Sequence, residues 1–291
     1  MQLLTEGQNK RAQSLMGTLE LSLLNLRERW PHGWPGLGLV FERCMGQLGH
    51  SDRHTLPPRL QVIHTCAQEL GAWLERDGSR RHRDDAEPQY HNRLHMADTL
   101  VCMTVLLLAQ REAQPVKRPA PSRHEWLAML AMLGHDLLHD GAVNRFPAEI
   151  ESRSVQALDP LMQHHGMHEQ DRQIVKHLIL KTDPLCVRQA HDQIADRPFR
   201  LDDQDCLAVL VEEADILAST LAVTGIELTQ QLSLEWASSN PAMSPVLLTP
   251  QGRLRFLQFG ALFSSPASQW LGIPRFRQAE IDALQSLISQ P

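Results

Sequence analysis

Apolar residues recur at steps of three and four positions along most of this chain, and this spacing constrains the fold more than any other feature. Such spacing puts apolar side chains on one face of an α-helix, whereas a half-buried strand alternates apolar and polar residues. Long alternating segments are absent from the sequence. We therefore expect an all-α protein. Apart from two helices that carry the motifs described below, the predicted helices cover residues 3–26, 40–48, 58–75, 148–162, 169–181, 203–223, 227–237, 251–262 and 278–288.

The turn-rich sequence W-P-H-G-W-P-G at residues 30–36 ends the first helix, because proline and glycine interrupt helices. A chain of 291 residues can bury a substantial core. We expect a compact multi-helix domain at residues 57–291 and an N-terminal helical extension at residues 1–56. The apolar stripe of residues 3–26 is compatible with packing on that domain, with a homodimer contact or with a docked partner, and packing is the simplest interpretation. Residues 76–88 are predicted to form a solvated charged loop, although their arginines could instead steer an anionic substrate.

Composition excludes some classes of partner. The net charge of -6 argues against non-specific nucleic-acid binding, which needs a basic surface. The apolar stretch at residues 99–109 is too short to cross a membrane, and the N-terminus lacks the pattern of a signal peptide. The five cysteines are widely spaced and form no CxxC pair, which is typical of free thiols in a reducing compartment. We therefore expect a cytoplasmic protein with no nucleic-acid or membrane partner.

Two short motifs carry most of the candidate chemistry. His91 and His95 lie one helical turn apart, and His135-Asp136 is followed one turn later by His139. Residues four positions apart share a helix face. Imidazole and carboxylate groups are ligands typical of zinc, iron and manganese. Burying several ionisable groups beside an apolar helix is costly unless they are compensated, and a metal ion supplies that compensation.

Helical context distinguishes these residues from similar ones elsewhere. A second His-Asp dipeptide, His191-Asp192, lies in a polar stretch without a further ligand at helical spacing, and we interpret it as surface. Asp215 lies in an otherwise apolar predicted helix, where an aspartate is rare unless it is paired or bound to metal. We expect Asp215 to be a ligand, with an arginine salt bridge as the alternative. Asp183 precedes a proline and is equally compatible with a helix-ending turn.

Four segments resemble one known family in the same order. Residues 90–98 read Y-H-N-x-x-H-x-x-D, and residues 135–144 read H-D-x-x-H-x-G-x-x-N. With the segments 178–183 and 214–216, they resemble the signatures of the HD-domain metal-dependent phosphohydrolases. Within that superfamily the chain is most similar to the catalytic domains of class I cyclic-nucleotide phosphodiesterases. The matches span roughly residues 60–265, so the resemblance implies an HD/PDEase-like catalytic domain.

The resemblance implies a binuclear metal site with four ligands: His95, His135, Asp136 and Asp215. These residues would hold the tighter metal, zinc or another transition metal such as iron or manganese. Asp136 would bridge to a second ion, magnesium or manganese, held largely by water. Either Glu149 or Glu151 could support those waters, whereas the simpler interpretation places both glutamates on a solvated helix face.

The resemblance also implies catalytic and substrate-binding roles. Water held between the two metals would attack phosphorus, and His91 would protonate the leaving oxygen as a general acid. His139 would orient water or phosphate beside the metals. Tyr90, the one tyrosine of the chain, and Asn144 are expected to contact substrate.

The segment that would read a nucleotide base departs from the family. Gln258 matches the glutamine that hydrogen-bonds a purine, whereas Ala261 stands where the family has a clamping phenylalanine. After Asp215, the run Leu217-Ala218-Ser219 replaces serine-asparagine-proline, so an asparagine expected to help read the base is missing. A glutamine on an amphipathic helix is as compatible with a surface position.

The leading hypothesis is a metal-dependent phosphoric ester hydrolase that cleaves the 3',5'-phosphodiester of a cyclic nucleotide. One alternative is a phosphatase for nucleoside monophosphates or another small phosphoester. Another is a non-catalytic HD-type module that senses a ligand in signalling. The complete ligand set that the resemblance implies favours an enzyme with a small-molecule phosphoester substrate.

Overall fold

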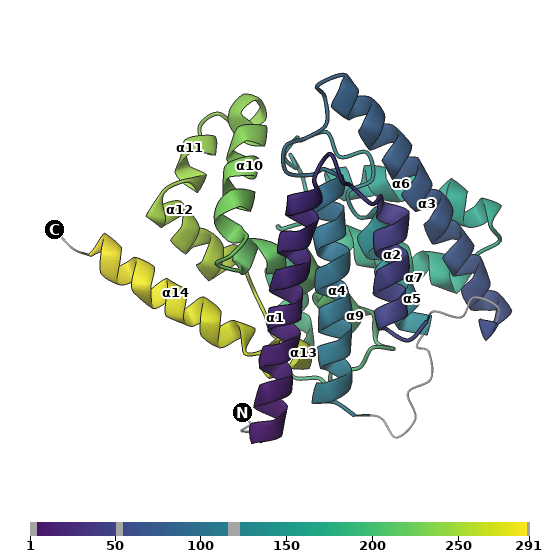
Figure 1. Ribbon diagram of the computed structural model, residues 1–291, viewed down its shortest axis with the longest axis horizontal. Coiled ribbons are helices and arrows are strands. Elements are labelled where there is room, and N and C mark those ends of the chain that lie inside the picture. The colour runs from purple at the N-terminus through teal and green to yellow at the C-terminus, as the bar shows by residue number, and fades with distance from the viewer. Residues whose placement is uncertain (1–4, 51–54, 116–122, 290–291) are drawn as a thin grey trace.

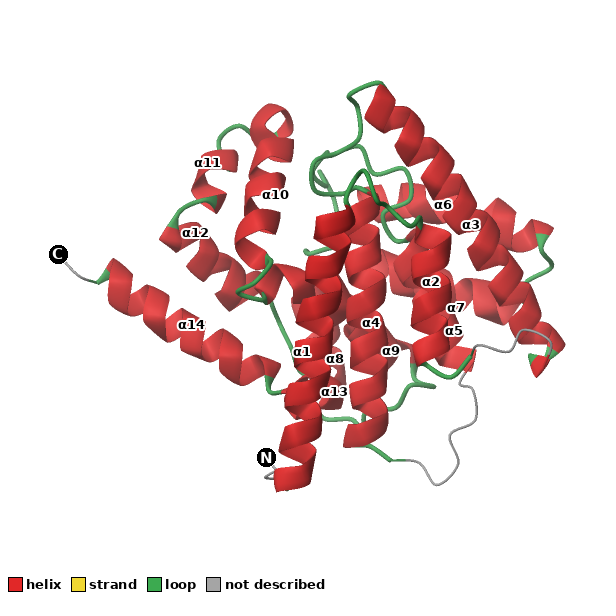
Figure 2. Cartoon of the chain, viewed as in Figure 1, coloured by secondary structure: helices red, strands yellow, loops and turns green. Residues whose placement is uncertain are grey.

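The computed structural model describes residues 5–50, 55–115 and 123–289. Every regular element in these ranges is a helix, as Figure 2 shows, and no strand occurs among them. The prediction of an all-α protein is therefore confirmed. The helices are α1 (Glu6–Arg29), α2 (Leu37–Gln47), α3 (Pro58–Arg83), α4 (Arg93–Ala113), α5 (Arg123–Gly134), α6 (Glu149–His164), α7 (Glu169–Lys181), α8 (Val187–Ile194), α9 (Gln204–Thr220), α10 (Gly225–Ser239), α11 (Ser244–Leu247), α12 (Pro250–Arg255), the π-helical turn η2 (Phe256–Gly260), α13 (Pro266–Leu271) and α14 (Ile273–Ile288).

Helix α3 is longer than predicted. It continues to Arg83, so the loop expected at residues 76–88 is wrong for its first eight positions. The charges of this segment support the helix, because Asp77 Oδ2 lies 2.7 Å from Arg81 Nε, one turn later, and Arg80 pairs with the same carboxylate. Helix α7 has the predicted bounds, while the predicted start of the first helix, Leu3, lies outside the described residues.

Helix α4 lies at the centre of the molecule. Side chains on all its faces are buried, because nearly every position from Leu94 to Ala109 is apolar or small. A helix that is apolar all round needs neighbours on every side. Helices α1, α2, α5, α9 and α13 supply those neighbours, and Figure 1 shows α1 running alongside α4.

The N-terminal helices share this core. Leu19 and Leu23 of α1 and Leu37 of α2 are fully buried in the same cluster as α4. The side chain of Thr5 caps α1 by accepting a hydrogen bond from the backbone of Gln8, whose own side chain accepts from the backbone of Thr5. The expected N-terminal extension, residues 1–56, thus packs on α4 over its described part. The division into two domains stays a prediction.

Three helices meet at the predicted site. Asn92 caps α4, and its side-chain oxygen accepts hydrogen bonds from the backbone of Leu94 at 2.9 Å and of His95 at 3.1 Å. Helix α5 ends at Gly134, so His135-Asp136 leaves the helix directly beside α4. Helix α9 crosses both and contributes Asp215 from its C-terminal half. Helices α10–α12 and α14 form an outer group (Figure 1).

Candidate metal centre

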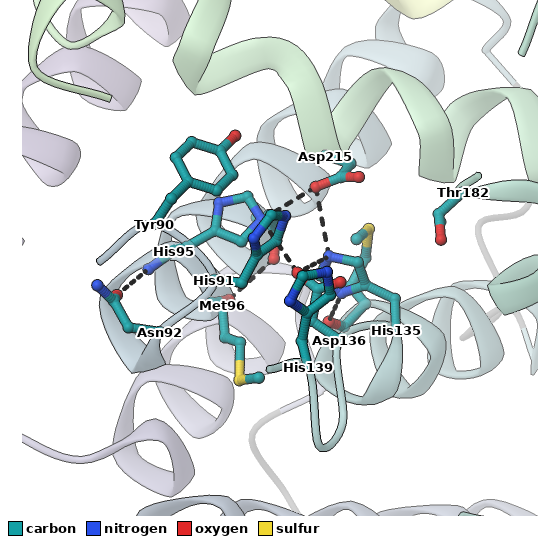
Figure 3. Close-up of polar contacts among 12 residues, drawn as sticks. Tyr90, His91, Asn92, His95, Met96, His135, Asp136, His139, Thr182 and Asp215 are labelled. Carbon is teal, nitrogen blue, oxygen red and sulfur yellow. Dashed lines mark hydrogen bonds and ion pairs between the residues drawn. The ribbon is translucent and has the colours of Figure 1, made fainter. Parts of the chain in front are cut away.

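Two imidazoles and two carboxylates form a ring in which the two kinds of group alternate. His95 Nε2 lies 3.4 Å from Asp136 Oδ2 and 3.2 Å from Asp215 Oδ1. His135 Nε2 lies 3.1 and 3.3 Å from the same two oxygens. Figure 3 shows these side chains, from three different elements, pointing toward one another. Ligands bound at about 2.0–2.2 Å are separated by about 3.0–3.5 Å when they are adjacent around one ion, so each of the four spacings is compatible with a pair of adjacent ligands.

The hydrogen-bond pattern of His135 fits metal binding. Its Nδ1 lies 2.8 Å from the carbonyl oxygen of Met132, which can only accept, so Nδ1 carries the proton. Nε2 is then the atom that faces the ring of ligands. Histidines that bind a metal through one ring nitrogen commonly donate the other N–H to a carbonyl in this way. His135 Nε2 and Asp136 Oδ2 are both buried without a hydrogen-bond partner among the described residues. Buried polar atoms without a partner are costly, and a cation bound between these two removes that cost.

The electrostatics of the ring also call for a cation. Burial alone would lower the pKa of His95, but the carboxylates of Asp136 and Asp215 outweigh burial and raise the pKa to about 9. They likewise raise the pKa of His135 well above its ordinary value against the effect of burial. A divalent metal can take the place of these protons. The donor set of two nitrogens and two oxygens suits zinc, iron or manganese.

A second triad shares one of these residues. Ligand atoms of His91, Asp136 and His139 lie within 4.8 Å of one another, as do those of His95, His135 and Asp136. These buried and half-buried groups could hold metal ions, with Asp136 common to both. A hydrogen bond determines, however, which nitrogen of His139 carries the proton. The Gly141 N–H donates to His139 Nδ1 at 3.0 Å, so the neutral ring carries its proton on Nε2 and is a donor there.

Glu235 fixes His91, and sequence reasoning missed this residue. Its Oε1 lies 2.5 Å from His91 Nδ1, and its Oε2 accepts from the backbone N–H groups of Tyr90 at 2.8 Å and His91 at 3.0 Å. Although burial favours the neutral acid, the His91 ring and these hydrogen bonds lower the pKa of Glu235 to about 2. Glu235 is therefore a carboxylate that holds the proton on His91 Nδ1, leaving Nε2 to face the site.

His91 and His139 lie against each other with complementary nitrogen atoms. Their rings stack at 3.7 Å between centroids. Burial and the neighbouring His91 ring lower the pKa of His139 to about 4, so His139 is neutral at pH 7. Neutral His139 offers an Nε2–H donor, whereas His91 offers Nε2 as a proton acceptor or, once protonated, as an acid. The pair can thus bind an anionic oxygen and transfer a proton beside the ring.

Of the residues expected to bind substrate, Tyr90 lies against His95, Asn144 is hydrogen-bonded away from the metal ligands, and Gln258 has neither contact. The Tyr90 ring lies 4.6 Å from that of His95, and its hydroxyl is 2.9 Å from Ser219 Oγ. Asn144 accepts from the backbone of Ile150 and donates to the carboxylate of Glu151 at 2.9 Å. Gln258 lies half-buried on η2, and no hydrogen bond of its side chain to another described residue is seen.

Two other carboxylates considered as site residues, Asp183 and Glu149, have partners of their own. Asp183 accepts from the backbone of Ala148 at 2.6 Å and of Leu185 at 2.9 Å, which supports the turn interpretation. Glu149 pairs with Arg145 and Arg153. Glu149 and Glu151 are 6% and 8% exposed, so the interpretation that places them on a solvated helix face is wrong.

The interpretation of His191 as a surface residue is wrong. His191 lies on α8 and is 8% exposed, while Asp192 is exposed. His191 Nε2 lies 3.6 Å from Glu212 Oε2 on α9, and neither atom has a hydrogen-bond partner among the described residues. An eight-residue helix with only two apolar turns gives too short a pattern to be seen against its polar surroundings.

No protein-family model and no curated protein sequence compared with the chain matches it. Among the described residues, no helix is long and apolar enough to span a membrane.

Proposed function

We propose that this protein is a metal-dependent phosphohydrolase with an HD-like fold, and that a cyclic-nucleotide 3',5'-phosphodiester is its substrate. The alternating ring of His95, His135, Asp136 and Asp215 is the observation that carries the proposal. A phosphodiester is anionic and hydrolyses slowly, so its cleavage needs charge neutralisation, an activated water and a proton for the leaving oxygen. The ring and the adjacent His91–Glu235 pair offer groups for all three tasks.

The ring residues would hold the tighter metal, and Asp136 would also face a second ion beside His139. Zinc, iron or manganese in the ring, with magnesium or manganese beside it, would neutralise phosphate charge and make bound water more acidic. The chain itself orients the ligands. The Met132 carbonyl fixes the tautomer of His135, and the Asn92 cap fixes the first turn that carries His95.

His91 would supply the proton to the leaving oxygen. Glu235 holds the Nδ1 proton, so a proton on Nε2 is the one available for transfer. His139, held neutral, would donate its Nε2–H to a phosphoryl oxygen. Tyr90 lies across the His95 ring and would close that side of the site to water.

A nucleoside monophosphate is the second candidate substrate. Ala261 is fully buried at the position where the resemblance places a base-clamping phenylalanine, and Phe259 beside it is exposed to solvent. A phosphomonoester would use the same ring and the same acid without needing that clamp. A non-catalytic sensing module would keep the fold without turnover.

Elemental analysis combined with hydrolysis assays tests the proposal. Purified protein supplied with manganese is assayed on cAMP, cGMP, a nucleoside monophosphate and bis(p-nitrophenyl) phosphate. We expect bound transition metal and hydrolysis of at least one diester. His91→Ala should keep the metal and lose about 100-fold or more in kcat, whereas Asp215→Ala should lose the metal as well. Hydrolysis of the monoester alone favours the second candidate, and metal-free, inactive protein rejects both. Loss of metal from His91→Ala would make His91 a ligand.

A further inference from the structure

Arg27 of α1 connects three helices. Its Nη1 and Nη2 donate to Asp98 Oδ1 and Oδ2 on α4 at 2.9 and 2.7 Å. Its Nε donates to Glu227 Oε2 on α10 at 3.2 Å. The arginine side chain is 9% exposed, whereas Glu227 is 43% exposed. One buried guanidinium therefore ties α1 and α4 to the first turn of α10.

The contact with Asp98 is a strong one. Asp98 is fully buried one turn after His95, and every hydrogen bond of its carboxylate to a described residue comes from Arg27. A two-point contact between guanidinium and carboxylate fixes both distance and orientation. An unpaired buried carboxylate would be costly, so Arg27 is held firmly on α4. Its remaining nitrogen then presents a fixed donor to α10.

Helix α10 meets the α4 region at a second point through Glu235. That carboxylate binds the backbone of Tyr90 and His91 and the His91 ring, just before α4 begins. Glu227 and Glu235 are eight residues apart on one helix, a rise of about 12 Å. His91 lies two residues before α4 begins, and Asp98 lies in the second turn of that helix. The two acidic residues of α10 are thus held at two places, Glu235 by His91 just before α4 and Glu227 by the arginine that binds Asp98 on α4.

We propose that Arg27 is a positioning residue for the site: through Asp98 and Glu227 it sets how α10 lies along α4, and so holds Glu235 on His91. The N-terminal helix, outside the segments that resemble the phosphohydrolases, then contributes to the orientation of the acid. Its effect on turnover rests on the proposed function, but its effect on the His91–Glu235 hydrogen bond does not.

Glu227→Ala in the full chain is the sharpest test, because it leaves the buried Arg27–Asp98 pair intact. Gln230→Ala, at an exposed position on the same helix, is the matched control. The readouts are the imidazole Nδ1 proton of His91 in NMR spectra of zinc-loaded protein and the kinetics on the best diester. We expect Glu227→Ala to shift or broaden that proton resonance and to lower kcat about tenfold with KM within about twofold, as for a misaligned group. The control should change neither.

Arg27→Lys is the second variant. A lysine can still neutralise Asp98 but cannot fork two oxygens and also reach Glu227, so it should keep the fold and show the same change as Glu227→Ala. If the resonance and kcat match the unmodified protein in both variants, the inference is overturned. If the resonance changes while no variant or parent hydrolyses any phosphoester, the positioning role stands and the proposed function fails.

Discussion

Glu212 is a buried carboxyl group with no evident compensation. It is 2% exposed on α9, and neither of its side-chain oxygens has a hydrogen-bond partner among the described residues. His191 Nε2, at 3.6 Å, is beyond hydrogen-bonding range. Burial, together with the neighbouring charge of Glu213, raises the pKa of Glu212 to about 9. The folded protein therefore keeps this group protonated at neutral pH, whereas the unfolded chain ionises it.

Replacing Glu212 by glutamine should therefore stabilise the protein, increasingly so as the pH rises. The pKa of Glu212 in the folded protein is above the unfolded value of 4.5. The contribution of this group to the free energy of unfolding is therefore fully present below pH 4.5 and is lost as the pH rises toward 9. A glutamine at this position does not ionise, so the stability of the variant does not fall in this way as the pH rises. We expect Glu212→Gln to raise the free energy of unfolding by about 3–5 kcal/mol at pH 8 and to change it little at pH 4.5, measured by urea denaturation.

The neighbouring Glu213 provides the control. Its oxygens accept hydrogen bonds from the backbone of Ser264 and Ser265 and from the hydroxyls of Ser265 and Ser268. A glutamine can keep one oxygen on the two backbone N–H groups, but its amide nitrogen cannot accept from the two hydroxyls, so Glu213→Gln should destabilise the protein at both pH values. A gain for Glu212→Gln that is equal at pH 4.5 and pH 8 would contradict the raised pKa.

At the scale of single residues, the sequence predicted those site residues that lie in short motifs. His91, His95, His135 and Asp136 lie close in sequence to one another or to a recognisable partner, and the structure brings them together. Glu235 lies 144 residues from His91, in a helix whose other residues gave no sign of a site. In the sequence Glu235 stands between Leu234 and Trp236, and nothing local marks it as a site residue. Long-range pairing of this kind has no local pattern.

At the scale of elements, the crossing of α3 and α4 depends on a glycine. A Cβ atom at Gly78 would lie 2.5 Å from Cδ and Nε of Arg93. Arg93 cannot move aside easily, because it is 7% exposed and its guanidinium binds Glu75 and Glu87. Two helices can approach this closely only where one of them lacks a side chain.

Gly78→Ala should therefore destabilise the protein even though alanine favours helices. Alanine gains about 1 kcal/mol over glycine within a helix, whereas overpacking of a fixed neighbour costs about 1–3 kcal/mol. We expect a net loss in the free energy of unfolding. In α1, a Cβ atom at Gly17 would lie more than 4 Å from the atoms packed around it, so Gly17→Ala should stabilise by about 1 kcal/mol. Thermal melts give the melting temperature of each variant relative to the parent protein. A Gly78→Ala variant that melts above the parent would refute the crowding argument.

The helices that the sequence revealed best are those with long apolar stripes. The bounds of α7 were predicted correctly, and α9 and α10 differ from prediction by a few residues at each end. The segment 251–262 was predicted as one helix but forms α12 and the π-helical turn η2, which ends at Gly260. Short helices such as α8 and α13 span too few turns to show a periodicity of their own. Whether such segments form helices depends on their tertiary contacts.

At the scale of the whole molecule, α1 and α2 complete the core around α4. Leu19, Leu23, Leu37, Phe41 and Met45 are at most 1% exposed and belong to the same cluster as the apolar residues of α4. Fully burying a side chain of this size stabilises by about 1.5–3 kcal/mol, or about 8–15 kcal/mol for five of them. A domain of ordinary stability has only about 5–15 kcal/mol in total.

Residues 57–291 alone should therefore fail to fold cooperatively, although the sequence predicts a domain there. Removing residues 1–56 exposes one side of α4 and takes Arg27 away from the buried carboxylate of Asp98. We expect the fragment to lack a cooperative thermal transition by circular dichroism and to bind a hydrophobic dye, and residues 1–56 added as a separate chain should restore the transition. A fragment that melts cooperatively by itself would show that the N-terminal helices cover a domain complete without them, and would confine the role of Arg27 to orienting α10.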